Sequence, residues 1–246
     1  ENFSLEGKVA LITGASYGIG FAIAEGMAAA GAKIVFNDLK QEFVDKGLAN
    51  YKEAGIDAKG YVCDVTDEDA VNAMVAKIEE EVGVIDILVN NAGIIKRIPM
   101  IEMKASEFRQ VIDVDLNAPF IVSKAVIPTM IKMGHGKIIN ISSIAAITGL
   151  YDRVDYATAK AGMLGMAKAL AMEVGQYNIC VNCISPGVIE TDMCAGVSKD
   201  TMARLAQEAP VGRNGTAEDV ARAMEYLAYA DFVTGQVLPV NGGLVL

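Results

Sequence analysis

The chain of 246 residues is 52% hydrophobic and 21% charged, which supplies apolar material for a core and excludes an intrinsically disordered protein. Its formal net charge of −10 argues against nucleic acid and anionic membrane as partners. The polar residues 1–7 do not have the pattern of a secretory leader, and no charge-free apolar stretch is long enough to span a bilayer, so we expect neither. We therefore expect a cytoplasmic protein that acts on a small molecule.

Short β-branched runs alternate with helix-length segments, a pattern typical of a parallel sheet covered by helices. The expected strands are 9–13, 33–37, 58–62, 87–90, 137–141, 179–184 and 236–240. The expected helices are 18–30, 41–54, 67–82, 105–133, 156–177 and 217–229. Because no linker separates them, they predict an α/β fold with a single-domain doubly wound parallel sheet of about seven strands. Residues 190–210 lack a strand and are a candidate substrate lid.

The cysteines and the single histidine, His135, do not predict a metal site. Cys180 and Cys183 have C-x-x-C spacing, but they fall in an expected strand, where residues three apart point to opposite faces. Cys63 and Cys194 stand alone in the sequence. We expect four reduced cysteines that act as small apolar side chains.

A glycine-rich turn joins the first expected strand to the first expected helix, with spacing G-x-x-x-G-x-G. Glycines in this place let backbone N–H groups approach a pyrophosphate at a helix N-terminus. The turn therefore predicts a dinucleotide site, although a purely structural turn is the alternative. Its candidate cofactor-binding residues are Gly14, Ser16, Tyr17, Gly18, Ile19 and Gly20.

Asp38 follows the second expected strand, 18 residues after Gly20. An acid about 20 residues after the glycines accepts hydrogen bonds from the adenine ribose. A carboxylate there would repel the extra phosphate of NADP, and residues 36–39, which end at Leu39, contain no arginine. We predict NAD as the cofactor, with NADP as the alternative, and a solvated capping acid as the structural alternative for Asp38.

Further turn residues fall at the carboxyl ends of other expected strands, the edge where ligands bind in open α/β sheets. They extend the predicted cofactor site along this edge, and they are Asp64, Val65, Asn91, Ala92, Gly93, Pro186 and Gly187.

Tyr156 and Lys160 open a long expected helix, and residues four apart share a helix face. A tyrosine with an ordinary pKa of about 10 is a poor base, but a nearby ammonium favours its phenolate. Ser143 follows the fifth expected strand, so its hydroxyl can hold the substrate oxygen. These three residues predict a proton-transfer site beside the dinucleotide.

The motifs T-G-A-S-Y-G-I-G, N-N-A-G, Y-A-T-A-K and S-P-G-V-I-E-T, together with Ser143, resemble the short-chain dehydrogenase/reductase family over essentially the whole chain. The resemblance implies that Tyr156 is the general acid/base. It also implies that Lys160 activates Tyr156 and binds the nicotinamide ribose, and that Ser143 orients the reacting oxygen. It further implies cofactor contacts from Ile189 and Thr191 and a homotetramer.

One position departs from the family pattern. Many members carry an asparagine in N-L-x-x-x-F that helps to hold a relay water, whereas this chain has Asp115 there, with Asn117 two residues later. Asp115 is therefore a candidate catalytic residue that serves the relay in place of the asparagine, and the alternative is that the relay is rebuilt.

The substrate is indicated by two further resemblances. Residues up to Gly136 are similar to gluconate 5-dehydrogenases, and the rest resembles 3-oxoacyl-[acyl-carrier-protein] reductases. Lys96 and Arg97 can bind a carboxylate, which favours a sugar acid, with a surface or subunit contact as the alternative. The two docking arginines of the reductases match Gly134 and Met172, which are uncharged. The sugar-acid reading therefore leads, and the acyl-carrier reading is the alternative.

Two other classes of protein also use glycine turns on α/β sheets. A methyltransferase needs neither Y-x-x-x-K nor N-N-A-G, so the sequence disfavours it. A non-catalytic nicotinamide sensor would retain the fold, but the intact Ser143, Tyr156 and Lys160 argue against it, while Asp115 keeps it open.

Overall fold

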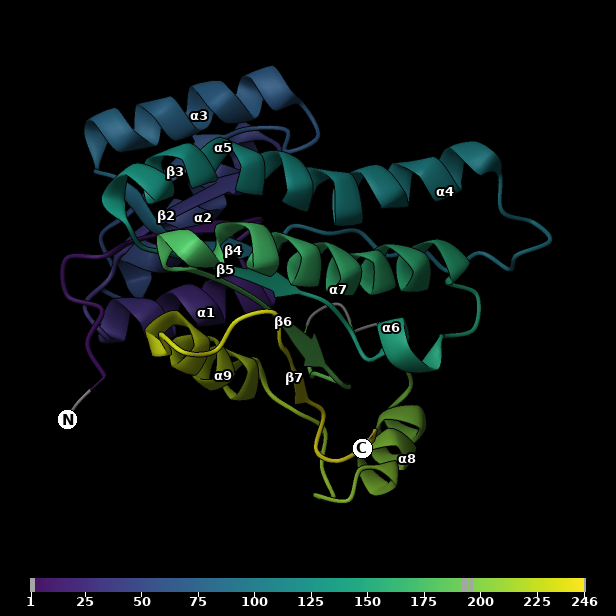
Figure 1. Cartoon of the computed structure of the whole chain (residues 1–246). Helices are drawn as coiled ribbons and strands as arrows, with labels where there is room; N and C mark the ends of the chain where they lie inside the picture. Colours follow the sequence, from purple (N-terminus) through teal and green to yellow (C-terminus); the bar gives the residue numbers. More distant parts are fainter. Residues whose placement is uncertain (1–2, 192–193, 195–196, 246) are drawn as a thin grey trace.

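The computed structural model describes residues 3–191, 194 and 197–245 (Figure 1). Seven parallel strands form one sheet in the order β3-β2-β1-β4-β5-β6-β7. This order confirms the predicted doubly wound α/β fold, because the chain winds outward from β1 in one direction and then from β4 in the other. The strands are β1 (Val9–Thr13), β2 (Lys33–Asp38), β3 (Ala58–Val62), β4 (Ile85–Asn90), β5 (Gly136–Ile141), β6 (Ile179–Pro186) and β7 (Val237–Val240).

Helices cover both faces of the sheet. They are α1 (Gly18–Ala29), α2 (Gln41–Glu53), α3 (Glu68–Glu81), α4 (Ala105–Ile112), α5 (Ala118–Met133), α6 (Ala145–Thr148), α7 (Val154–Val174), α8 (Lys199–Glu208) and α9 (Ala217–Tyr229). A π-helical turn, Asp113–Asn117, joins α4 to α5, and a 3-10 turn, Gly175–Tyr177, follows α7.

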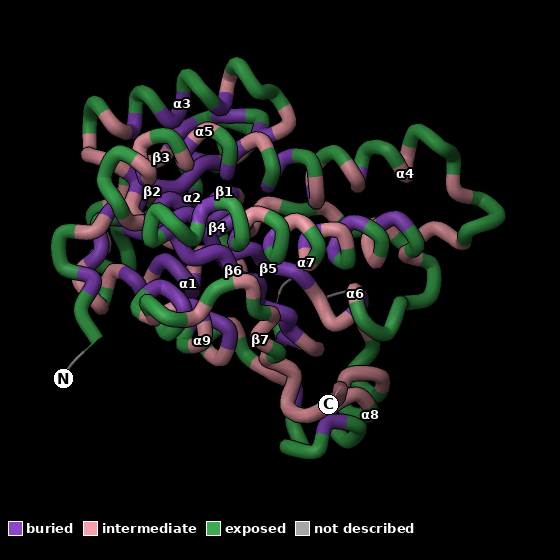
Figure 2. Tube along the Cα trace, in the orientation of Figure 1, coloured by how far each residue is buried: buried purple, intermediate pink, exposed green. Residues whose placement is uncertain are grey.

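The sheet separates two apolar cores, because successive strand residues point to opposite faces. Ala10 and Ile12 of β1 pack with α1, α2 and α9, whereas Val9 and Leu11 pack with α3, α5 and α7. The strands at the centre are buried along their length (Figure 2). This double burial explains their continuous apolar sequences.

The expected helix 105–133 is present as one continuous stretch that contains the π-helical turn. By length and composition alone it could cross a membrane, but core helices pass the same test. Its α5 part packs against β4 and β5, and its π-helical turn buries Asp115 completely. The sheet therefore accounts for the apolar face of this helix.

Two helices were not expected from the sequence: α6, and α8 within the predicted lid. Part of that lid, residues 192–193 and 195–196, lies outside the described residues, and its role as a lid stays a prediction. The expectation of reduced cysteines is met, because Cys63, Cys180, Cys183 and Cys194 are all free. Over the described part of the chain, no group of three metal-ligating side chains comes together.

Candidate active site

The glycine turn after β1 is joined directly to the turn after β4. The Thr13 hydroxyl accepts hydrogen bonds from the backbone N–H groups of Asn91 and Ala92, both at 3.0 Å. The Asn91 amide donates back to the Thr13 carbonyl at 2.9 Å. Gly14 has φ +60°, and a Cβ on it would lie 2.9 Å from Ala92 Cα, so only glycine fits this approach.

The turn is also held from the side of α2. The Tyr51 hydroxyl donates to the Ala15 carbonyl at 2.7 Å, and the Asn50 amide donates to the Ser16 carbonyl at 3.0 Å. Ser16 is 1% exposed, and its hydroxyl has no hydrogen-bond partner among the described residues. The sequence did not predict these two hydrogen bonds, because Asn50 and Tyr51 on α2 are far from the turn in sequence.

The N-terminus of α1 fits a phosphate group. Its N-cap, Tyr17, is exposed and makes no side-chain capping bond, and no acid stands in the first turn. Gly18 has φ +67°, Ile19 is half-buried, and a Cβ on Gly20 would lie 2.4 Å from the Asn91 amide. The backbone N–H groups of the first helical turn, the helix dipole and the Ser16 hydroxyl, which no described residue binds, together fit a dinucleotide pyrophosphate.

Asp38 and Asp64 follow neighbouring strands at the same edge of the sheet, as expected. Asp38 is the last residue of β2, and one carboxylate oxygen accepts the N–H of the exposed Leu39 at 2.9 Å. Asp64 accepts bonds from the backbone and hydroxyl of Thr66, while Val65 is buried. The turn residues at this end therefore present one exposed leucine and two acids.

Lys160 and Tyr156 lie together on α7, which packs against β6. Lys160 is 4% exposed, and its ammonium donates to the Ile141 carbonyl at 2.9 Å and lies 5.5 Å from the centre of the Tyr156 ring. The Ser142 hydroxyl donates to the Lys160 carbonyl at 2.9 Å. Ser143, next in the chain, therefore lies beside α7, and its hydroxyl accepts the N–H of Ala145 at 3.1 Å.

Asp115 reaches this site from the π-helical turn. It is completely buried, accepts the Ile94 N–H at 2.7 Å, and places its other oxygen 3.9 Å from the Lys160 ammonium. Burial raises the pKa of Asp115 to about 6, while the Lys160 charge and the Ile94 N–H oppose this rise. A Cβ on Gly93 would lie 3.4 Å from the Asp115 carboxyl group, so this carboxyl group lies directly beneath the turn after β4.

Asp155 is a second buried carboxyl group that sequence reasoning missed. It precedes Tyr156, accepts the Tyr156 N–H at 2.7 Å, and has one oxygen without a partner among the described residues. Its charge contributes to the raised pKa of Asp115. No residue pattern predicted this, because an acid in the first turn of a helix is ordinary.

The predicted carboxylate ligands Lys96 and Arg97 are placed differently. The Lys96 ammonium donates to the Gln110 side chain on α4 at 2.5 Å, whereas Arg97 is exposed. Burial lowers the pKa of Arg153 most, and the positive charge of Arg97 lowers it further. The interaction of Arg153 with Tyr156 acts in the opposite direction and raises this pKa. Arg153, which sequence reasoning did not identify, thus lies near Arg97 and Tyr156.

The remaining predicted cofactor residues follow β6. Pro186 ends that strand, and Gly187 donates to Val240 at 2.9 Å with no room for a Cβ. Ile189 is buried, and Thr191 lines a cavity of about 540 Å³ beside α8. These residues border the predicted lid, as the sequence indicated.

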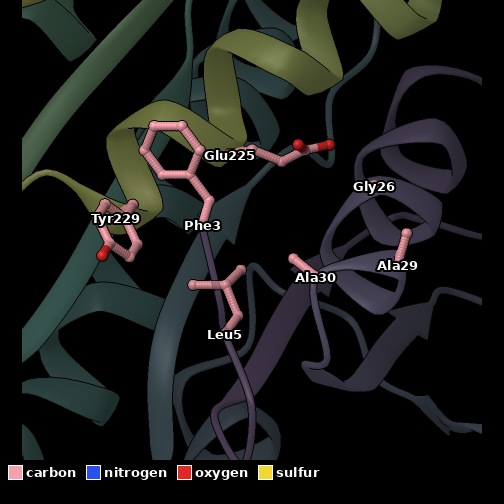
Figure 3. Close-up of a pocket in the computed structure, with 7 residues that line it drawn as sticks. All are labelled: Phe3, Leu5, Gly26, Ala29, Ala30, Glu225 and Tyr229. Atoms are coloured by element: carbon pink, nitrogen blue, oxygen red, sulfur yellow. The ribbon is translucent and has the colours of Figure 1, made fainter. Parts of the chain in front are cut away.

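A smaller cavity of about 230 Å³ lies away from this edge, near the ends of α1 and α9. Figure 3 shows Phe3 and Tyr229 among the residues that line it, and their rings pack edge to face with centroids 4.7 Å apart. Glu225 is its single ionisable lining residue apart from Tyr229. This lining offers none of the catalytic groups described above.

The chain is similar to several known proteins. A family model described as enoyl-(acyl carrier protein) reductase matches residues 14–245. The chain is 43% identical to 2-dehydro-3-deoxy-D-gluconate 5-dehydrogenase of Formosa agariphila, over 99% of this chain and 94% of that protein. It is 42% identical to the 3-oxoacyl-[acyl-carrier-protein] reductase of Escherichia coli, over 99% of both.

Two solved structures are also similar. The 2-keto-3-deoxy-D-gluconate dehydrogenase of Streptococcus agalactiae is 57% identical, with a TM-score of 0.86 over 99% of this chain and 95% of that one. A gluconate 5-dehydrogenase of Burkholderia cenocepacia, in complex with NADP and tartrate, is 36% identical, with a TM-score of 0.92 over 98% of this chain and 96% of that one.

The chain belongs to the short-chain dehydrogenase/reductase family. It is an NAD(P)-dependent oxidoreductase that acts on CH–OH or keto groups, as the resemblance implied. The methyltransferase and sensor alternatives therefore have no support. Its relatives divide between sugar-acid dehydrogenases and acyl-carrier reductases.

Proposed function

We propose that this protein interconverts a secondary alcohol and a ketone of a sugar acid, with NAD as cofactor. The observation that carries the proposal is the buried Lys160 ammonium, fixed by the Ile141 carbonyl and facing Tyr156 on the same helix. This pair lies beside Ser143, at the sheet edge that also holds the glycine turn.

Nicotinamide supplies or accepts the hydride when the cofactor is bound. In the reducing direction, the Tyr156 hydroxyl donates its proton to the carbonyl oxygen as the carbonyl carbon is reduced to an alcohol. Lys160 stabilises the resulting phenolate, and Ser143 holds the reacting oxygen by a hydrogen bond. Asp115, behind Lys160, occupies the place of the usual relay asparagine and would fix the ammonium's position.

The proposed cofactor residues extend from the glycine turn through Asn91, Ala92 and Gly93 to Ile189 and Thr191. Asp38 favours NAD, because its carboxylate can accept bonds from ribose hydroxyls and would repel a phosphate. We expect Asp38→Ala to narrow the preference for NAD over NADP roughly tenfold, read from kcat/KM with each cofactor. An unchanged ratio would remove Asp38 from this role.

A sugar acid is the favoured substrate because Arg97 is an exposed cation on the loop after Gly93, where its guanidinium could bind a carboxylate. Relatives named for 2-dehydro-3-deoxy-gluconate and gluconate support a hydroxyl or keto group at carbon 5 of such an acid. The second candidate is 3-oxoacyl-[acyl-carrier-protein] reduction, supported by 42% identity to the Escherichia coli reductase.

A side-by-side assay tests the substrate proposal. Initial rates would be compared for three reactions: the reduction of 5-ketogluconate, the oxidation of 2-keto-3-deoxygluconate and the reduction of a short 3-oxoacyl thioester. The reductions would be run with NADH and with NADPH, and the oxidation with NAD and with NADP. We expect a kcat/KM at least tenfold higher for one of the sugar acids. A thioester that outpaces both would replace the proposal with the second candidate.

We also propose a cytoplasmic homotetramer, as the family resemblance implies. Large apolar side chains are exposed on separate helices, including Phe120 on α5 and Met172 on α7, and their burial between subunits would stabilise an assembly. Light scattering on the purified protein would give a mass four times that of the chain, and a monomer mass would contradict the proposal.

A further inference from the structure

Arg153 occupies a position that helix energetics disfavour. It is the N-cap of α7, where short side chains that accept hydrogen bonds are preferred, and its own side chain makes no capping bond. A cation there also faces the positive end of the helix dipole. Residues that break local rules in this way concentrate at functional sites.

Arg153 lies close in the chain to the proposed proton donor. It immediately precedes α7, and Tyr156 is the third residue of that helix. The electrostatic effect of Tyr156 on the pKa of Arg153 agrees with this placement. Figure 1 shows this end of α7 beside the loop that precedes α4, well away from α9.

That loop brings in a second arginine. The Ile98 N–H donates to the Asp152 carbonyl at 2.9 Å, which ties the residue after Arg97 to the residue before Arg153. Asp152 takes the left-handed conformation with φ +60°, which is unfavourable for a residue with a Cβ. The chain thus holds two arginines together through a strained turn.

Among the residues that the structure describes, these two guanidinium groups have no anionic partner. Neither forms an ion pair with a carboxylate within the described ranges. The buried Arg153 Nε has no hydrogen-bond acceptor there, and one terminal nitrogen donates to the Tyr151 carbonyl at 3.1 Å. Like charges held close with unsatisfied donors are destabilising until an anion joins them.

We propose that Arg153 and Arg97 together bind the carboxylate of the substrate and set its distance from Tyr156. This inference rests on the proposed sugar-acid function and adds Arg153 as a specificity-determining residue. A planar guanidinium suits a carboxylate because it can donate two parallel hydrogen bonds. Lys96 is not part of this pair, because Gln110 already accepts its ammonium.

The test measures binding of tartrate, a carboxylate that serves as a probe, to the protein–NADH complex by calorimetry. Arg153→Gln and Arg97→Gln should each weaken tartrate binding roughly 10- to 100-fold. In the double variant, the fold-loss of tartrate affinity should be smaller than the product of the fold-losses in the two single variants, because both side chains bind the same carboxylate. Arg153→Lys should bind tartrate more tightly than Arg153→Gln but less tightly than wild type, since lysine keeps the positive charge but cannot donate two parallel hydrogen bonds.

Arg222→Gln is the matched control, because Arg222 is exposed on α9 and its loss changes the net charge equally. Kinetics add a second measurement, in which Arg153→Gln should raise the KM for the sugar acid and leave the KM for a neutral polyhydroxy ketone within twofold. A folded Arg153→Gln variant that binds tartrate as well as Arg222→Gln does would overturn the inference. A wild-type enzyme that is inactive on every sugar acid would instead overturn the proposed function.

Discussion

Three ionisable side chains, Asp115, Asp155 and Lys160, are buried near the first turns of α7. If all three were charged, one negative charge would be uncompensated in the interior, which is energetically unfavourable. Burial raises the pKa of Asp115 to about 6, so this group takes a proton at mildly acidic pH and removes the excess charge there. The site thus combines a buried ammonium with a carboxyl group whose pKa lies well above its ordinary value.

Tyr156→Phe removes the hydroxyl that transfers the proton and leaves the ring in place. We expect turnover to fall roughly a thousandfold or more, while NADH affinity changes by no more than a few fold. Nicotinamide absorbance would measure turnover, and fluorescence titration would measure affinity. Wild-type turnover in this variant would refute the assignment.

Asp115→Asn tests the titration of the buried carboxyl group. Its folded pKa of about 6 lies above the ordinary 3.8, so the folded state binds this proton more tightly than the unfolded state does. The resulting contribution to the free energy of unfolding is complete below the unfolded value and is lost as pH rises through about 6.

The variant lacks this contribution. Relative to wild type, its free energy of unfolding should therefore rise by about 3 kcal/mol between low pH and neutral pH. Urea unfolding of both proteins across this range would measure the change. A difference that stays constant with pH would show that Asp115 does not titrate in this way.

Tyr156, Lys160 and Ser143 could be predicted because their spacing within one helix and one strand end is visible in the sequence. Asp155 and Arg153 could not, since each gains its significance from a contact that the sequence does not show. For Arg153 that contact is the bond between Ile98 and Asp152, which joins two distant loops.

The turns after β1 and β4 can contact each other because position 14 is a glycine, which has no side chain. A Cβ at Gly14 would lie 2.9 Å from Ala92 Cα, and the Ala92 backbone is itself hydrogen-bonded to Thr13. Gly55, after α2, has a similar φ of +74° but nothing within 4 Å of its Cβ position. Substitution of Gly55 therefore measures the effect of backbone strain alone, whereas substitution of Gly14 adds a steric clash to the same strain.

Gly55→Ala should lower the free energy of unfolding by about 1 kcal/mol, because the left-handed conformation disfavours a Cβ. Gly14→Ala should lower it by roughly 2–4 kcal/mol, since overpacking adds to the same strain. It should also weaken NADH binding at least tenfold, whereas Gly55→Ala should not. Chemical denaturation and titration would show this, and equal stability losses would contradict the proposed close approach.

The seven strands could be predicted from their short β-branched apolar runs, and the long helices from the length of the segments between these runs. The helix α6 could not, since its four residues are too few to show a period. The helix α8 has apolar residues at helical spacing, Met202, Leu205 and Ala206, but none of its residues is buried, so this short stripe does not stand out from the predicted lid. The π-helical turn is equally hidden, because its residues also fit an ordinary helix.

The net charge of −10 bears on the acyl-carrier alternative, because carrier proteins are themselves acidic. Like charges disfavour docking between the two proteins. Met172, at one position where the reductases carry a docking arginine, is 87% exposed and uncharged. The surface of the chain therefore supports a free small-molecule substrate more than a protein-bound one.

A 3-oxoacyl group should accordingly be reduced no faster on a carrier protein than on a short free thiol. The double variant Gly134→Arg and Met172→Arg should raise kcat/KM for the carrier-bound substrate severalfold at low salt and leave the free thioester unchanged. Steady-state rates with both substrates would measure this. A wild-type preference for the carrier-bound group would contradict the charge argument.

The bonds between Thr13 and the turn at Asn91 join neighbouring strands from distant parts of the chain. A dinucleotide seated there would bridge the block β3-β2-β1 and the block that begins at β4. Ligand at a hundredfold excess over its Kd adds about 2.7 kcal/mol to native stability. We therefore expect NADH to slow proteolysis and amide exchange across the entire sheet, so that nicotinamide supply would influence the lifetime of the polypeptide.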